Sequence, residues 1–177
     1  MACRVIPNRD RKMLAWWSSW CLPICLVWAM ASDARRFEIP HTTQIVPLAV
    51  FLIAAAFGAW PWDEVGWRIG LAVLVLALGF VLSVVRVLGA GDSKLIAALS
   101  LWLGPGLMLP CLFVMAIAGG VLAAILLIYR KRPLPAAWAG RPWLSELHAA
   151  QNDVPYGIAI GIAGLAVFPE ILARAAH

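Results

Sequence analysis

The segment LIAALSLWLGPGLMLPCLFVMAIAGGVLAAILLI, residues 95–128, decides the fold because it contains no charged side chain. A helix that crosses a bilayer needs about 20 apolar residues, so the segment is too long for one crossing and barely long enough for two. The GPG sequence at residues 104–106 and Pro110 favour a break within it. We therefore predict a short helix followed by a full one.

Outside this segment, further uncharged windows approach the length of a membrane span. They run from about Leu14 to Ala31, from Ile45 to Trp60, from Ile69 to Val85 and from Val154 to Val167 or slightly beyond. The 177 residues are 63% hydrophobic and 13% charged, far from the composition of a soluble domain. We predict an all-α, polytopic integral membrane protein with about six transmembrane helices. A basic tail, residues 1–13, precedes a single transmembrane domain, residues 14–175.

The longest polar segment, Arg130 to Asp153, is short and contains three prolines, so we expect a loop rather than a soluble domain. The cysteines form no CxxC pair and no metal-type spacing; they are Cys3, Cys21, Cys25 and Cys111. We expect neither a metal site nor a cofactor, and we interpret Cys21 and Cys25 as packing residues on one helix face. Several tryptophans near predicted helix ends fit an interfacial belt, namely Trp16, Trp17, Trp60, Trp62 and Trp67.

Two predicted crossings separate Asp33 from Asp92, so both must lie on one side of the membrane. The loops on that side carry eight basic residues, Arg35, Arg36, Arg86, Lys94, Arg130, Lys131, Arg132 and Arg141. The other side holds Arg68, Arg174 and the four basic residues of the tail, Arg4, Arg9, Arg11 and Lys12. The positive-inside rule places the three loops in the cytoplasm, and the basic tail disagrees with this orientation.

Two explanations of the basic tail stay open. Translation that starts at Met13 would remove its four charges. Alternatively, the basic start, the apolar stretch and AMA at residues 29–31 imitate a signal peptide that would be cleaved just before Asp33.

Few acids are expected at the membrane, where a carboxylate is costly enough to require a reason. They are Asp33, Asp92 and Glu170, of which Glu170 is expected at the opposite interface. We place Asp63 and Glu64 in a solvated loop. Each aspartate also has a purely structural interpretation. Asp92 follows a glycine and suits a helix N-cap, while Asp33 ends an apolar helix and can pair with Arg35 or Arg36.

Taken together, Asp33 and Asp92 suggest chemistry, because they are two acids at one membrane face on different helices. Two adjacent carboxylates cannot both ionise cheaply, so one keeps its proton while the other stays charged. Such a pair acts as general acid and general base on one bound water, without a metal or a covalent nucleophile. Gly89 and Gly91 lack side chains and so let the backbone and an extended substrate approach Asp92 closely.

Three segments carry a resemblance to a known family. GAGDSKL, residues 89–95, resembles the GxGD signature of intramembrane aspartyl peptidases, and its Lys-Leu is typical of the type IV prepilin peptidase branch. SDARRFEIPHTTQI, residues 32–45, resembles the segment around that family's first aspartate. VPYGIAIGIAG, residues 154–164, resembles its third signature, which opens the last helix. The three occur in the family's order.

This resemblance implies six or more helices and cleavage of a short basic leader from prepilins or pseudopilins, just before their hydrophobic helix. It implies that Asp33 and Asp92 are the catalytic acids, and that the protein lies in the bacterial inner membrane with its site facing the cytoplasm. Further motif and substrate-approach residues would be Gly89, Gly91, Lys94, Pro40, Pro155, Tyr156 and Gly157. No nucleic-acid partner is expected.

The chain also departs from the longer family members, since it lacks their cysteine-rich insertion, which accompanies N-methylation. It resembles the short, peptidase-only branch that serves tight-adherence (Flp-type) pili. His41 stands where the family more often has Asn or Asp, and we interpret it as a surface residue of a loop. For Lys94 we favour snorkelling to the interface over an electrostatic effect on the two acids.

Two other functions remain open at this point. A small transporter or channel subunit would use Asp33 and Asp92 to handle protons or cations, although such acids more often lie at mid-helix. An assembly factor that kept the fold but lost activity would not need both aspartates intact.

Overall fold

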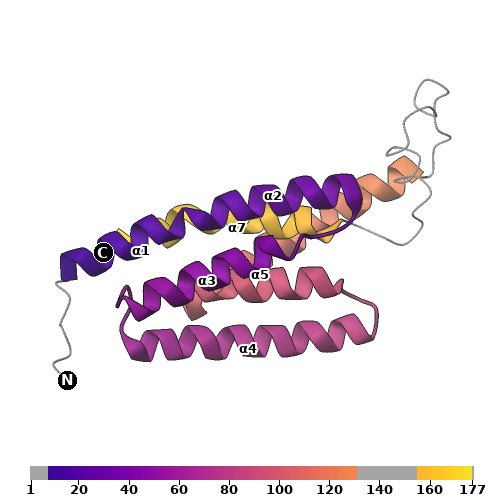
Figure 1. The fold of residues 1–177 in the computed structure, drawn as a ribbon. Coiled ribbons are helices and arrows are strands. Elements are labelled where there is room, and N and C mark those ends of the chain that lie inside the picture. Colours follow the sequence, from indigo (N-terminus) through magenta and orange to yellow (C-terminus); the bar gives the residue numbers. More distant parts are fainter. Residues whose placement is uncertain (1–7, 131–154, 177) are drawn as a thin grey trace.

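The computed structural model describes residues 8–130 and 155–176, all of whose regular elements are helices (Figure 1). These helices are α1 (Asn8–Ser19), α2 (Cys21–Arg36), α3 (Thr42–Ala56), α4 (Trp62–Val84), α5 (Ala90–Arg130) and α7 (Tyr156–Ala176). The predicted all-α class is confirmed. The predictions for residues 1–7, for residues 131–154 and for Cys3 fall outside the described residues.

Among the described helices, four stretches are long and apolar enough to cross a membrane. They are Arg9–Arg36, Trp62–Val84, Ala90–Tyr129 and Tyr156–Ala175, and the shorter apolar helix Thr42–Ala56 adds to them. The first stretch joins α1 and α2, which are separated only at Trp20. Pro23 explains the break, because it has no N–H to donate to the carbonyl of Ser19. The chain is therefore a multi-pass membrane protein.

Helix α5 is bent into two halves at Gly104, whose φ of 60° and ψ of −179° are outside helical values. Only glycine adopts this conformation readily. Ile96 and Met115, which lie on either side of the bend, line one groove, so the two halves run side by side. The predicted break at GPG is thus present, and it gives a short first half and a longer second half.

The chain turns leave both aspartates at the same end of the bundle. Figure 1 shows that α2 ends, α5 begins and ends, and α7 begins at one end, while the N-terminus and the C-terminus lie at the other. Helix α4 ends at the aspartate end of the bundle in a Schellman turn. In this turn the N–H of Arg86 donates to the carbonyl of Ser83, and the N–H of Val87 donates to the carbonyl of Leu82. Arg86 adopts the left-handed φ of 60° that this turn requires.

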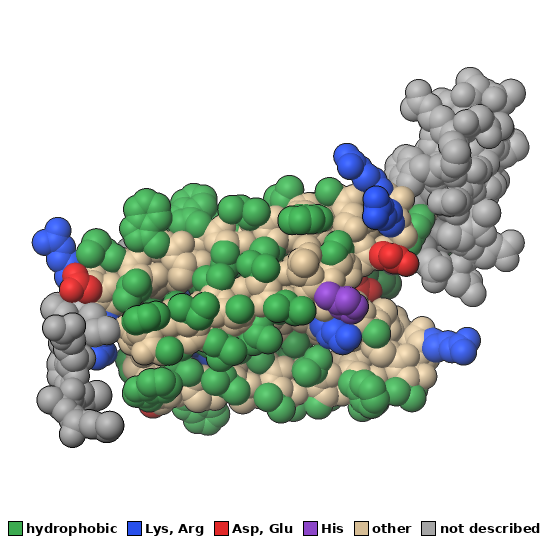
Figure 2. Space-filling model, viewed as in Figure 1, with side chains coloured by type: hydrophobic (Ala, Val, Ile, Leu, Met, Phe, Trp, Pro, Cys, Tyr) green, Lys and Arg blue, Asp and Glu red, His purple; other side chains and the backbone are tan. Residues whose placement is uncertain are grey.

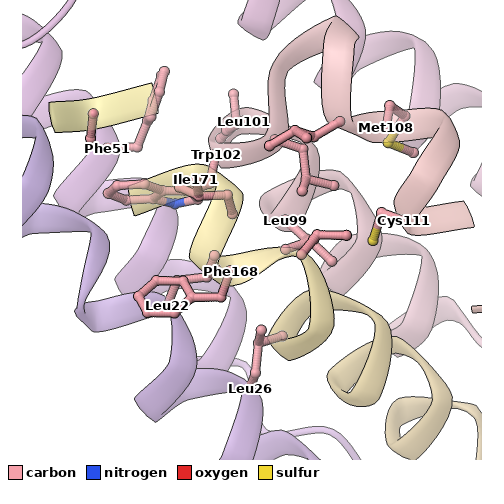
Figure 3. Close-up of a cluster of buried hydrophobic side chains, with 14 of the residues drawn as sticks. Leu22, Leu26, Phe51, Leu99, Leu101, Trp102, Met108, Cys111, Phe168 and Ile171 are labelled. Atoms are coloured by element: carbon pink, nitrogen blue, oxygen red, sulfur yellow. The ribbon is translucent and has the colours of Figure 1, made fainter. Parts of the chain in front are cut away.

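The buried core joins α2, α3, α5 and α7 (Figure 3). At its centre the ring of Trp102 packs edge-on against those of Phe51 and Trp60, and its Nε1 donates to the carbonyl of Pro47 at 3.2 Å. Trp60 stacks on Phe51 and is buried, so its assignment to the interfacial belt was wrong. Trp17, Trp62 and Trp67 are exposed at helix ends, as a belt requires. Cys25 is buried and its thiol is free, in agreement with a packing role.

Hydrophobic side chains cover the middle of the face shown in Figure 2, and charged side chains gather at its two ends. Arg68, in contrast, points into the bundle, and only 7% of it is exposed. Its Nη1 donates to the carbonyls of Leu101 and Trp102, each at 2.9 Å, and its Nη2 lies 2.6 Å from Glu64 Oε1. The prediction of a loop at Asp63 and Glu64 was therefore wrong, although Asp63 is exposed as predicted. Both residues lie in the first turn of α4, and Glu64 pairs with Arg68.

Candidate functional site

Asp33 lies in the last turn of α2 and faces the first turn of α7. Only 5% of the residue is exposed, and the backbone N–H groups of Gly157 and Ile158 face its carboxylate. A Cβ at Gly157 would lie 2.7 Å from Asp33 Oδ2, so only a glycine leaves room for this carboxylate. The buried Oδ2 atom has no hydrogen-bond partner among the described residues, which leaves it free to accept one from a water or a substrate.

Asp92 lies in the first turn of α5, which begins at Ala90, so it is not the helix N-cap. Its carboxylate folds back over the preceding turn. A Cβ at Gly89 would lie 2.6 Å from Asp92 Oδ2, which means that this carboxylate also rests on a glycine. Each aspartate therefore packs against a glycine, whose missing side chain leaves space for the carboxylate.

A cavity of about 460 Å³ brings the two acids together. It is lined by Asp33, Phe37, Ser83, Arg86, Val87, Leu88, Gly89, Asp92, Pro155 and Tyr156. The ion pair of Asp33 with Arg35 or Arg36 is absent from the structure, where both arginines are exposed. Two carboxyl groups that share a cavity at the end of a bundle can divide the work of an acid and a base.

A buried hydroxyl network fixes the first turn of α5, which carries Asp92. Ser93 Oγ lies 2.9 Å from the carbonyl of Gly79 and 3.0 Å from that of Gly89, and it also lies 2.9 Å from Ser83 Oγ. From the other side, Gln44 Nε2 donates to the carbonyl of Gly91 at 3.2 Å. The position of Asp92 is thus set by α3 and α4 as well as by its own helix.

Gly79 permits this arrangement because a Cβ there would lie 2.8 Å from Ser93 Cβ. The sequence pattern did not predict four of these residues, Gly79, Ser83, Ser93 and Gln44. A signal existed only for Gly79, which interrupts an apolar helix at a cost in helix stability. The other three are polar residues whose partners lie on other helices, so no local pattern points to them.

Of the predicted motif residues, Gly89, Pro155 and Tyr156 line the cavity, and Gly157 lies beneath Asp33. The remaining ones lie around it. Gly91 packs against Ile39, with 3.4 Å between a Cβ at Gly91 and that of Ile39, and the carbonyl of Pro40 accepts bonds from Thr43 at the start of α3. His41 is exposed beside that start.

Lys94 does not line the aspartate cavity. It is exposed at one end of an apolar groove of about 350 Å³ between α3, α4 and α5, here called the α3/α4 groove. This position agrees with the snorkelling interpretation of Lys94, and it removes the residue from the immediate approach to the acids.

The fold and the cavity define a multi-pass membrane protein with a buried pair of acids. A family model described as the type IV leader peptidase family matches residues 20–128. The chain belongs to this family, a family of peptidases. The match includes Asp33 and Asp92 and ends before the segment that opens α7. Searches of curated proteins and of solved structures gave no match.

Proposed function

We propose that the chain is an intramembrane aspartic endopeptidase that removes the short basic leader of prepilins at the cytoplasmic face of the membrane. The observation that carries this proposal is the cavity shared by Asp33 and Asp92 at the common end of α2, α5 and α7. Family membership supports prepilin-type substrates. The lack of a cysteine-rich insertion supports the peptidase-only, Flp-type branch.

In this mechanism the two carboxyl groups hold one water between them. The charged carboxylate takes a proton from the water while the oxygen of this water attacks the carbonyl carbon of the scissile peptide bond. The protonated partner donates its proton to the carbonyl oxygen, which gives a gem-diol. The carboxyl group that took the proton of the water then gives it to the leaving nitrogen as the C–N bond breaks, and the other carboxylate takes a proton back from a gem-diol hydroxyl, which becomes the C=O of the product acid. The unpartnered Oδ2 of Asp33 is one position at which this water can be held. No metal ligand is needed for these steps.

Position along the bundle favours this proposal over a transporter. Both acids lie at helix ends, in the last turn of α2 and the first turn of α5, whereas a transport site is expected near the bilayer midplane. The scissile peptide bond of a substrate, placed just before its hydrophobic helix, reaches such a site while that helix stays in the lipid.

The direct test is to co-express the chain with a Flp-type prepilin in a host without its own prepilin peptidase. We expect a shorter product whose mass places the cut just before the hydrophobic segment. An uncut prepilin beside a stably inserted chain would contradict the proposal. In that case proton flux into proteoliposomes, measured with a pH-sensitive dye, tests the transporter instead.

Gly79→Ala should slow cleavage by about 10- to 100-fold, because an added Cβ displaces Ser93 and with it the neighbouring Asp92. The measurement is the initial rate of prepilin cleavage by purified protein in detergent. Gly70→Ala is the matched control, since a Cβ at Gly70 of the same helix meets nothing within 4 Å. Equal rates for the two variants would show that the Gly79 contact does not position Asp92.

A further inference from the structure

A second groove begins where the aspartate cavity ends. It has a volume of about 350 Å³ and lies between the second half of α5, the start of α7 and the loop before α5; we call it the α5/α7 groove. Leu88 and Tyr156 line both the cavity and this groove, so the two spaces adjoin each other. The α3/α4 groove has the same volume but shares no lining residue with the aspartate cavity.

The floor of the α5/α7 groove is made of small residues. Ala116 and Gly120 are four residues apart and exposed, and Gly119 and Ala123 repeat this spacing three positions further along the helix. In a membrane, small residues at this spacing let a second helix approach the backbone closely. A Cβ at Gly120 would meet nothing within 4 Å, so no side chain of the described part of the protein fills this place.

A second and independent observation points to a ligand beside the groove. Asp33 lines the adjoining cavity, and its buried Oδ2 atom has no hydrogen-bond partner among the described residues. A polypeptide whose scissile bond lies beside this atom must continue away from the cavity. If its next segment is apolar and helical, the apolar groove next to the cavity provides a surface for it.

We propose that the α5/α7 groove binds the hydrophobic helix of the substrate that follows the scissile bond. This inference rests on the proposed peptidase function and adds to it the surface that recognises the substrate. Ala116 and Gly120 form the contact with the bound helix, and Leu88 and Tyr156 mark the point where the chain passes from the groove to the two acids.

The test compares two substrates, an intact prepilin in mixed micelles and a synthetic peptide that spans the scissile bond but ends before the hydrophobic helix. Gly120→Leu fills the groove. We expect it to raise KM for the intact prepilin by about tenfold or more with little change in kcat, as loss of uniform binding does. Cleavage of the short peptide should stay within about twofold of wild type, because the acids are untouched.

Gly70→Leu is the matched control for an exposed glycine of a helix, and Ala72→Leu fills the competing α3/α4 groove. Ala116→Leu provides a second variant on the same floor in case Gly120→Leu does not insert. Equal KM values for both floor variants and Gly70→Leu would overturn the proposal, as would an effect confined to Ala72→Leu. An equal loss of kcat/KM on the intact prepilin and on the short peptide, in the two floor variants, would overturn it as well. If wild type cleaves neither substrate, the peptidase proposal itself fails.

Discussion

Asp33→Asn and Asp92→Asn should each reduce cleavage of a co-expressed prepilin by about 10²- to 10⁴-fold, the range that general acid–base catalysis supplies. Asparagine keeps the shape of the side chain but neither takes nor gives the proton. Asp33 and Asp92 line one cavity, so replacing either one removes half of the proposed acid–base pair. Leader removal is measured by the mass of the prepilin after a fixed induction time.

Asp63→Asn is the matched control for these variants. Asp63 is an exposed aspartate in the first turn of α4, so the same chemical change occurs in a membrane helix but outside the cavity. We expect cleavage at the wild-type rate. Both cavity variants must also be recovered from the membrane in wild-type amounts. A variant that is recovered and still cleaves at the normal rate would exclude its aspartate from the reaction.

Arg68→Met should lower the free energy of unfolding by about 3–5 kcal/mol, because two buried carbonyl groups lose their donor at a cost of about 1–3 kcal/mol each. Helix α5 explains why. The carbonyl of Leu101 would normally accept from residue 105, but Pro105 has no N–H, and the bend at Gly104 takes the next donor away from Trp102. Arg68 Nη1 supplies both missing bonds, so methionine leaves two buried acceptors without a donor.

Urea or SDS unfolding in mixed micelles, followed by tryptophan fluorescence, measures this loss. Arg35→Met is the control, because Arg35 is exposed and its replacement should change stability by about 0.5 kcal/mol or less. Arg68→Lys should fall between the two, since lysine keeps the charge but lacks the planar fork that reaches two carbonyls and Glu64 together. An unchanged unfolding midpoint for Arg68→Met would show that the bend in α5 does not depend on Arg68.

Uncharged windows predicted where the helices lie but not where they end. Helix α1 begins at Asn8 rather than near Leu14, and α4 begins at Trp62 rather than Ile69. In both cases the missed turns contain charged residues, which a search for uncharged windows excludes. These turns are nevertheless stable as helix, because charged side chains at helix ends reach the polar boundary of the membrane.

The candidate site was only partly predictable, and the reason is physical. The number of crossings between Asp33 and Asp92 follows from hydrophobicity, and it fixes their common side. The contacts that position Asp92 depend on which helices pack together, and nothing local in the sequence encodes the meeting of Ser93 with Gly79. Arg68 was counted only as a charge on one side of the membrane for the same reason, since the carbonyls that it binds lie more than thirty residues away along the chain.

The glycine beneath each carboxylate has a consequence for how this enzyme can be altered. A side chain at residue 89 or 157 would compete with an aspartate oxygen for the same space. Random mutagenesis of the cavity should therefore recover glycine alone at these two positions among active clones. Changes in substrate preference should instead accumulate in the walls, at Phe37, Val87 and Tyr156, which line the cavity without supporting either acid.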